Sequence, residues 1–178
     1  TDLGGPELLN NLGDGTFYQA SSAMGATVPY DPEHLASWGT SVVDLNQDGW
    51  EDLAMVFGPL MPHGDPGDLS FADPGAGDWV DEDDQRDVLL VNDGGRSFRD
   101  VSSASGFDDP RLGRVLAVGD LDRDGRPDLV TAGIWYAQTW MNRGGCAGGV
   151  TVSLRHPTTG VAIGAQVDAH IGDRVLRR

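Results

Sequence analysis

The chain has 178 residues, of which 39 % are hydrophobic, with 26 glycines and 10 prolines. This composition disfavours long helices and predicts one all-β domain, or one domain and part of another, built from short strands and tight turns. The net charge of −16 excludes nucleic acid and anionic membrane surfaces as expected partners, and no apolar run approaches the roughly 20 residues that span a bilayer.

The first recurring element is a hairpin with a glycine-rich turn at residues 8–17, Leu-Leu-Asn-Asn-Leu-Gly-Asp-Gly-Thr-Phe. A similar stretch occupies residues 89–98, and a weaker third copy occupies residues 139–145. The first two copies read as a strand that ends in Asn, a turn, and a second strand that opens with a hydroxyl residue and Phe. Because Asn and Gly tolerate the positive φ values of hairpin turns, we expect antiparallel strands at these places.

An acidic loop interleaves with the hairpins. It begins at Asp44 as Asp-Leu-Asn-Gln-Asp-Gly-Trp-Glu-Asp-Leu and recurs 76 positions later, at Asp120, as Asp-Leu-Asp-Arg-Asp-Gly-Arg-Pro-Asp-Leu. Short apolar segments flank each loop, so each unit reads as strand, acidic loop, strand. The flanking segments are residues 41–43, 53–57, 115–118 and 129–132. With the hairpin that follows, each repeat has four strands.

The spacing within the acidic loops predicts two calcium sites. Calcium takes six to eight oxygen ligands, and loop positions 1, 3, 5, 7 and 9 supply them, position 7 through its backbone carbonyl. Glycine at position 6 allows the sharp turn. The predicted ligands are Asp44, Asn46, Asp48, Trp50 and Asp52 in the first loop, and Asp120, Asp122, Asp124, Arg126 and Asp128 in the second. We expect the ions to be structural, with affinities between millimolar and micromolar.

Other interpretations of these loops are weaker. Position 12 is Met55 or Thr131 rather than Glu, and strand-like residues flank the loops, so they are not EF-hands. Magnesium rarely uses an all-protein cage, and zinc would call for Cys or His ligands. An ordinary Asx turn is the alternative for a single loop, but two copies with the same ligand positions favour a cation, since the carboxylates would otherwise repel one another.

A Gly-, Pro- and Asp-rich insertion at residues 58–86 interrupts the better-preserved repeat. It is either a solvated surface loop or a functional loop at the rim of the fold. In the functional interpretation Trp79 is the candidate anchor for a partner, because aromatic residues dominate binding hot spots; the alternative for Trp79 is packing within the loop.

From Gly148 the sequence pattern of the repeats ends, and strands are predicted at residues 150–154 and 164–170. We therefore divide the chain into regions 1–145 and 146–178.

The acidic loops and the turn from Asn11 to Phe17 resemble the FG-GAP/VCBS repeats of integrin α-like β-propellers. The resemblance covers roughly residues 5–143 and implies a partial β-propeller of four-stranded blades with calcium loops. About two and a half blades are present, whereas propellers close with about four to eight. The chain is therefore expected to be a fragment whose parent chain completes the ring, in preference to self-assembly of copies.

The C-terminal region resembles the start of an ASPIC/UnbV domain through its Val-Thr-Val-Ser-Leu and Ala-Ile-Gly-Ala-Gln-Val stretches. The family usually has Arg where Gln166 stands. VCBS repeats and ASPIC/UnbV domains occur together in proteins similar to cartilage acidic protein, which are secreted and bind matrix or partners. They also occur together in proteins encoded with enediyne biosynthesis.

Two functions follow as expectations. The first is a calcium-binding module for protein or glycan binding or adhesion outside the cytoplasm, secreted or periplasmic, since free calcium is millimolar there. The second is an enzyme or accessory subunit in enediyne-type natural-product biosynthesis. No catalytic motif supports the second, the four histidines are scattered, and Cys146 reads as a bystander thiol rather than a nucleophile. The question of enzyme activity stays open, with the balance against it.

Overall fold

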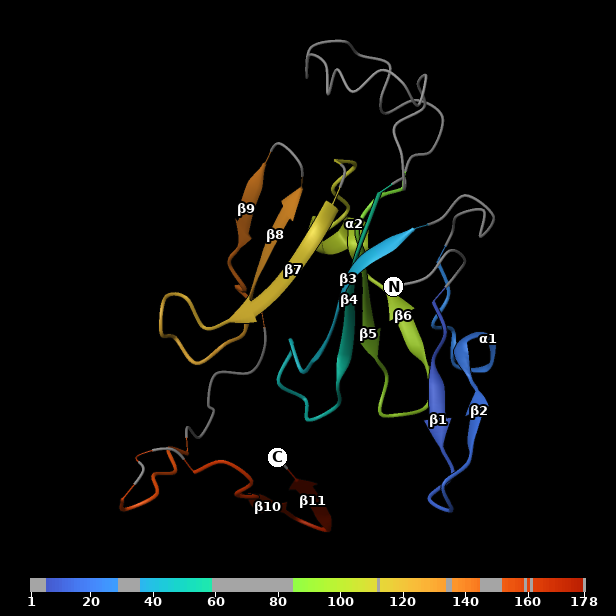
Figure 1. Ribbon diagram of the computed structural model, residues 1–178. Coiled ribbons are helices and arrows are strands. Elements are labelled where there is room, and N and C mark those ends of the chain that lie inside the picture. Colours follow the sequence, from blue (N-terminus) through green and yellow to red (C-terminus); the bar gives the residue numbers. More distant parts are fainter. Residues whose placement is uncertain are drawn as a thin grey trace, which may run out of the picture. The chain divides into compact units, whose positions relative to one another are not determined.

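A computed structural model describes residues 6–28, 36–58, 85–111, 113–133, 136–144, 152–158, 160 and 162–177. The chain divides into two compact units, Thr1–Gly145 and Cys146–Arg178. In the described residues the first unit contains three antiparallel sheets, and the second contains one (Figure 1). The predicted all-β class is confirmed, and none of these sheets closes on itself.

The chain begins with a two-stranded sheet and a single helical turn. Strand β1 (Leu9–Asn11) pairs antiparallel with β2 (Phe17–Gln19), as the Asn- and Gly-rich turn predicts. Helix α1 (Ser21–Met24) follows and ends at Gly25 in the left-handed region, with φ of 70°. No pattern in the sequence predicts this helical turn.

The central sheet has four antiparallel strands in chain order, and the first acidic loop connects its first two strands. The strands are β3 (Ser37–Val43), β4 (Asp52–Phe57), β5 (Val88–Asn92) and β6 (Phe98–Asp100). Val43 pairs with Asp52, so the loop directly joins two paired strands. A second helical turn, α2 (Ser102–Ser105), follows β6 as α1 follows β2.

The next sheet repeats this arrangement with three strands. They are β7 (Gly113–Gly119), β8 (Asp128–Gly133) and β9 (Ala137–Trp140). Gly119 pairs with Asp128, so the second acidic loop joins β7 to β8 as the first joins β3 to β4. The internal repeat seen in the sequence is therefore a structural repeat as well.

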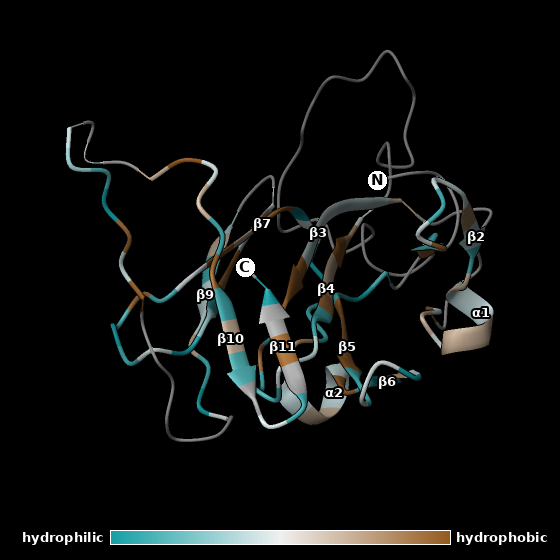
Figure 2. Ribbon diagram, turned by 90° about the horizontal axis from the view of Figure 1, so that it is seen from below, coloured by the Kyte–Doolittle hydropathy of each residue, from teal (hydrophilic) through white to brown (hydrophobic). Residues whose placement is uncertain are grey.

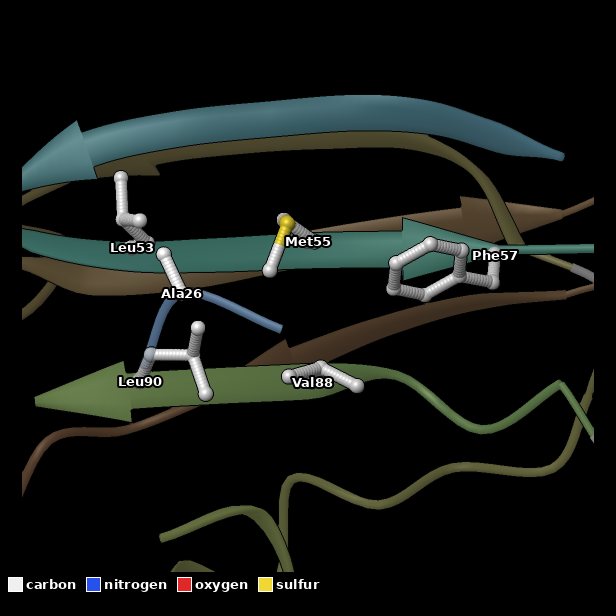
Figure 3. Close-up of a cluster of buried hydrophobic side chains, with 6 residues drawn as sticks. All are labelled: Ala26, Leu53, Met55, Phe57, Val88 and Leu90. Carbon is white, nitrogen blue, oxygen red and sulfur yellow. The ribbon is translucent and has the colours of Figure 1, made fainter. Parts of the chain in front are cut away.

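Strand β4 forms the centre of the core, and all six of its residues are buried. Leu53, Met55 and Phe57 point to one face, where they pack with residues of β5 and with Ala26 (Figure 3). Ala54 and Val56 point to the other face and join a second cluster that includes residues of β8. Because both faces are covered, β4 is a continuous apolar run rather than an alternating one; β4 and β5 are accordingly brown in Figure 2.

The two larger sheets approach closely where β3 meets β7. A Cβ atom added to Gly39 would lie 2.7 Å from the backbone nitrogen of Leu116 and 2.9 Å from a Val56 methyl carbon. These distances are shorter than real Cβ atoms tolerate, so glycine at position 39 permits the two strands to pack at this separation.

The second unit contains β10 (Asp168–Ile171) and β11 (Arg174–Arg177), which pair antiparallel. The predicted strand at 164–170 is thus wrong in its first half, because Gly164 has φ of 80° and forms a turn. The predicted strand at 150–154 is wrong for residues 152–154, which have no regular structure and no paired strand among the described residues. In the part of the chain described, no helix is long and apolar enough to cross a membrane.

Candidate metal centre

The two acidic loops lie at the same end of neighbouring sheets and touch each other. Gln47, at position 4 of the first loop, donates from Nε2 to the carbonyl oxygen of Gly125 in the second loop at 2.7 Å. Gln47 and its counterpart Arg123 both have positive φ, 58° and 64°, although neither is glycine. The two loops therefore share an unusual backbone conformation, which the sequence pattern alone did not indicate.

In the second loop, backbone N–H groups hold the carboxylates in place. The carboxylate of Asp120 accepts hydrogen bonds from the backbone nitrogens of Asp124 and Gly125, each at 3.0 Å. The Oδ1 atom of Asp124 accepts from the backbone nitrogen of Arg126 at 2.9 Å, and Asp122 accepts a longer bond of 3.3 Å from Asp124. Gly125 has φ of 85°, which favours glycine and permits this tight turn.

The first loop contains the same hydrogen bonds at the same positions. Asp44 accepts from the backbone nitrogens of Asp48 at 3.0 Å and of Gly49 at 2.8 Å. Asn46 accepts from Asp48 at 3.0 Å, and Asp48 accepts from Trp50 at 2.8 Å. Two segments 76 positions apart thus adopt the same loop structure, and each presents side-chain oxygens at positions 1, 3 and 5.

Carboxylate oxygens of Asp120, Asp122 and Asp124 lie within 4.8 Å of one another. All three residues are exposed, and each carboxylate oxygen that accepts one N–H keeps a further lone pair. Such an all-oxygen donor set suits a hard divalent cation and suits zinc poorly. The acidic triad is therefore chemically fit to hold a metal ion.

Two arginines border this triad. Arg126 forms an ion pair with Asp124, and Arg143 approaches the Oδ2 atom of Asp122 at 3.8 Å. These guanidinium groups offset part of the repulsion between the carboxylates. In the first loop the amide Nδ2 of Asn46 donates to Asp48 at 3.0 Å and replaces a third carboxylate, so the second loop has the larger concentration of negative charge.

Asp52 and Asp128, at position 9, are completely buried. Asp52 accepts from the backbone nitrogens of Leu45, at 2.9 Å, and Asn92, at 2.8 Å. Asp128 accepts in the same way from Leu121 and Asn142, both at 2.8 Å. Each carboxylate therefore joins its acidic loop to the end of the third strand of its sheet. That these two residues also bind calcium stays a prediction.

The pKa values of these two carboxyl groups shift in opposite directions. Burial raises the pKa of Asp52, although hydrogen bonds from Asn92 and Leu45 oppose the shift. The hydrogen bond from Asn142, followed by that from Leu121, lowers the pKa of Asp128. Asp128 is thus the more firmly ionised of the pair.

Sequence reasoning missed the role of Asn92 and Asn142. The Nδ2 atom of Asn92 donates to the carbonyl oxygen of Glu51 at 2.9 Å, and that of Asn142 donates to the carbonyl oxygen of Pro127 at 3.1 Å. Asn142 also donates to the carbonyl oxygen of Leu45 at 2.7 Å, which connects it to the first loop. The signal was available, because each Asn opens the turn of a recurring hairpin that follows an acidic loop.

Trp50 and Arg126, the predicted position 7 ligands, are held against their loops by hydrogen bonds. The backbone nitrogens of Trp50 and Arg126 donate to the Asp at position 5 of their own loops. The guanidinium of Arg126 also donates from Nε to the carbonyl oxygen of Asn142 at 3.0 Å. Both residues are therefore fixed against the loops, and the contribution of their carbonyl oxygens to a metal site stays a prediction.

A second polar cluster lies at the opposite end of the same sheets. Asp87 is completely buried; its Oδ1 accepts from the backbone nitrogen of Phe57 at 3.2 Å, and its Oδ2 has no hydrogen-bond partner among the described residues. Burial raises the pKa of Asp87 to about 8. The hydroxyl of Tyr136 also lacks a partner in the described part of the chain, and burial, together with the charge of Asp87, raises its pKa to about 12.

An ion pair borders this second cluster. Arg111 donates from Nε to both carboxylate oxygens of Asp109, at 2.8 and 3.0 Å. The guanidinium carbon of Arg111 lies 4.1 Å from the ring centroid of Tyr136, a cation–π contact. The carboxylate of Asp109 is thus committed to Arg111, whereas Asp87 has no ion-pair partner of its own in the described residues.

Trp79 and most of the insertion, together with Cys146, His34 and His63, lie outside the described residues. The described histidines, His156 and His170, are exposed. Comparison of the chain with protein-family models and with curated proteins found no match.

Proposed function

We propose that this chain is a calcium-binding, propeller-type repeat module that binds a protein or glycan outside the cytoplasm. The observation that carries the proposal is the duplicated loop scaffold, in which the same hydrogen bonds orient oxygen-bearing side chains at positions 1, 3 and 5 of both loops. In the second loop three carboxylates converge within 4.8 Å. A divalent cation there would neutralise charge that the arginines only partly offset.

Calcium is the favoured cation because each loop offers many oxygen atoms and no nitrogen or sulfur ligand. Loops of this kind with exposed ligands match the millimolar calcium found outside cells. Since the loops touch through Gln47 and Gly125, calcium in either loop would also stabilise the contact between neighbouring sheets. The ions would act as structural staples, leaving the other loops to contact a partner.

Thermal unfolding in calcium, in magnesium and in excess chelator tests the metal sites. At a calcium concentration of about 100 times the dissociation constant, we expect the two sites together to raise the midpoint by roughly 10 to 20 °C. Asp122→Ala is the best variant, because the only hydrogen bond Asp122 accepts within the loop scaffold is the long one of 3.3 Å. It should lose about half of the calcium-dependent rise while keeping its midpoint in chelator.

The exposed Glu7 provides the control, since Glu7→Ala removes one surface carboxylate that belongs to neither loop and should keep the full rise. Equal midpoints in calcium and chelator would contradict the calcium sites. The binding role is measured separately on a panel of glycans and extracellular-matrix proteins, with and without calcium. A stable calcium-bound chain that binds none of them would refute the binding role alone.

A further inference from the structure

A groove of about 520 Å³ lies beside β9. Its walls are mainly apolar and include Leu89, Phe107, Leu129 and Trp140. The rings of Phe107 and Trp140 meet edge to face, with centroids 5.1 Å apart. The groove is therefore a preformed apolar site between the central sheet and the three-stranded sheet.

The internal repeat shows what fills the corresponding place one repeat earlier. Leu129 and Trp140 correspond to Leu53 and Leu90, and Phe107 corresponds to Ala26, by the spacings of the acidic loops and the hairpins. Leu53, Leu90 and Ala26 belong to the first core cluster, and the side chain that packs against them from the fourth strand, β6, is Phe98.

The surroundings of the glycines that follow the two helical turns differ in the same way between the two repeats. A Cβ atom added to Gly25 would lie 3.0 Å from the carbonyl oxygen of Phe98, so β6 covers this position. The corresponding Gly106 has φ of 79°, close to the 70° of Gly25, but a Cβ atom there would meet no atom of the described residues within 4 Å. No strand of the described part of the chain therefore occupies, in the second repeat, the place that β6 occupies in the first.

The strand next to this place, β9, is an edge strand in the described part of the chain. The central sheet has the order β3-β4-β5-β6, whereas the next sheet ends at β9 among the described residues (Figure 1). An edge strand presents backbone N–H and C=O groups that can pair with an added strand. Extended peptides use such edges, and side-chain pockets beside the edge give them specificity.

We propose that β9 and this groove dock an extended segment of another polypeptide, which pairs antiparallel with β9 and inserts an aromatic side chain as Phe98 does. The inference names the class of partner for the binding role proposed above and rests on it. An aromatic anchor fits because the walls are apolar and because Phe98 fills the corresponding place. Backbone pairing also selects a polypeptide over a glycan as the occupant of this surface.

The probe is a synthetic peptide of residues 96–101, Arg-Ser-Phe-Arg-Asp-Val, the sequence that fills the earlier place. Fluorescence anisotropy with the full chain in calcium should show saturable binding of one peptide per chain. A peptide with Ala in place of Phe should bind roughly 10- to 100-fold more weakly. Because alternate N–H groups of an added strand face its partner, N-methylation of one alternate set should abolish binding and N-methylation of the other should not.

Ser105→Trp fills the groove from an exposed position on α2 and should abolish peptide binding. Ser103→Trp places the same ring on the same helical turn outside the groove and should leave binding intact. Calcium-dependent unfolding of both variants, measured on the same samples, separates a failure of docking from a failure of the calcium sites.

Absent binding, or binding that is indifferent to the Phe side chain and to both N-methylated sets, would overturn the proposal. A double variant in which Val152 and Leu154 are both changed to Asp tests whether the chain's own segment competes with the peptide. Both side chains are exposed in the structure. If the peptide binds only this double variant, the chain's own segment competes for the groove, and docking of a separate polypeptide is refuted.

Discussion

Replacing Asp52 by Asn is expected to lower the free energy of unfolding by about 2 to 4 kcal/mol, on the order of the cost of disrupting hydrogen bonds to a buried charged group. Both oxygens of Asp52 accept backbone hydrogen bonds, from Leu45 and Asn92, and the side chain is fully buried. An amide keeps one acceptor but turns an NH₂ group toward the second backbone N–H. Two donors would then face each other without water.

Urea unfolding in excess chelator measures this effect without any contribution from a bound metal. Asp128→Asn should behave similarly, since Asp128 receives the same pair of hydrogen bonds from Leu121 and Asn142. Asp93→Asn, at an exposed position, is the control and should change stability by less than about 0.5 kcal/mol. If Asp52→Asn lowered the free energy of unfolding only in calcium, the role of Asp52 would instead be to bind the metal.

Replacing Asp87 by Asn is expected to stabilise the protein, by an amount that grows with pH. Burial raises the pKa of Asp87 from its ordinary value of 3.8 to about 8, so the folded state keeps a proton that the unfolded state has already released. Stability therefore falls as pH rises from about 4 to about 8, by up to about 1.4 kcal/mol per pH unit, and is level above that range. Asn does not titrate and can still accept from Phe57.

The advantage of Asp87→Asn over the wild type should therefore increase by roughly 3 kcal/mol between pH 5 and pH 7, following the same linkage. Urea unfolding in chelator at both pH values measures it. Asp128, whose pKa is lowered, contributes its pH dependence below about pH 4. Asp52, whose pKa is raised, contributes equally to both proteins, so the difference between them cancels its effect. An identical difference at both pH values would show that Asp87 ionises normally in the folded protein.

Most strands and turns could be predicted from the sequence because they depend on residues close together in the chain. The Asn- and Gly-rich turns predicted the hairpins, and the strands around each acidic loop appear where the apolar segments predicted them. The duplication of the acidic loop also predicted two similar sites, and the structure gives both the same hydrogen bonds. The propeller and the calcium ions themselves stay predictions, as does the alternative of a biosynthetic enzyme, which rests on the family resemblance.

The features that escaped prediction depend on contacts between distant residues. Asn142 reaches Leu45 across 97 positions, and the polar cluster at Asp87 gathers Phe57, Asp109 and Tyr136 from different elements. The positive φ of Gln47 follows from the closed loop rather than from the preference of glutamine. At residues 152–154, alternation of apolar side chains did not suffice for a strand, because a strand also needs a neighbour to pair with.

Counting the calcium ions bound to the intact chain tests the central claim most directly. Native mass spectrometry at millimolar free calcium, supported by metal analysis of the same sample, measures the stoichiometry. Two calcium ions per chain are predicted for the wild type, and one for Asp122→Ala. A wild-type chain that is folded and carries no calcium under these conditions would contradict the account of the two acidic loops.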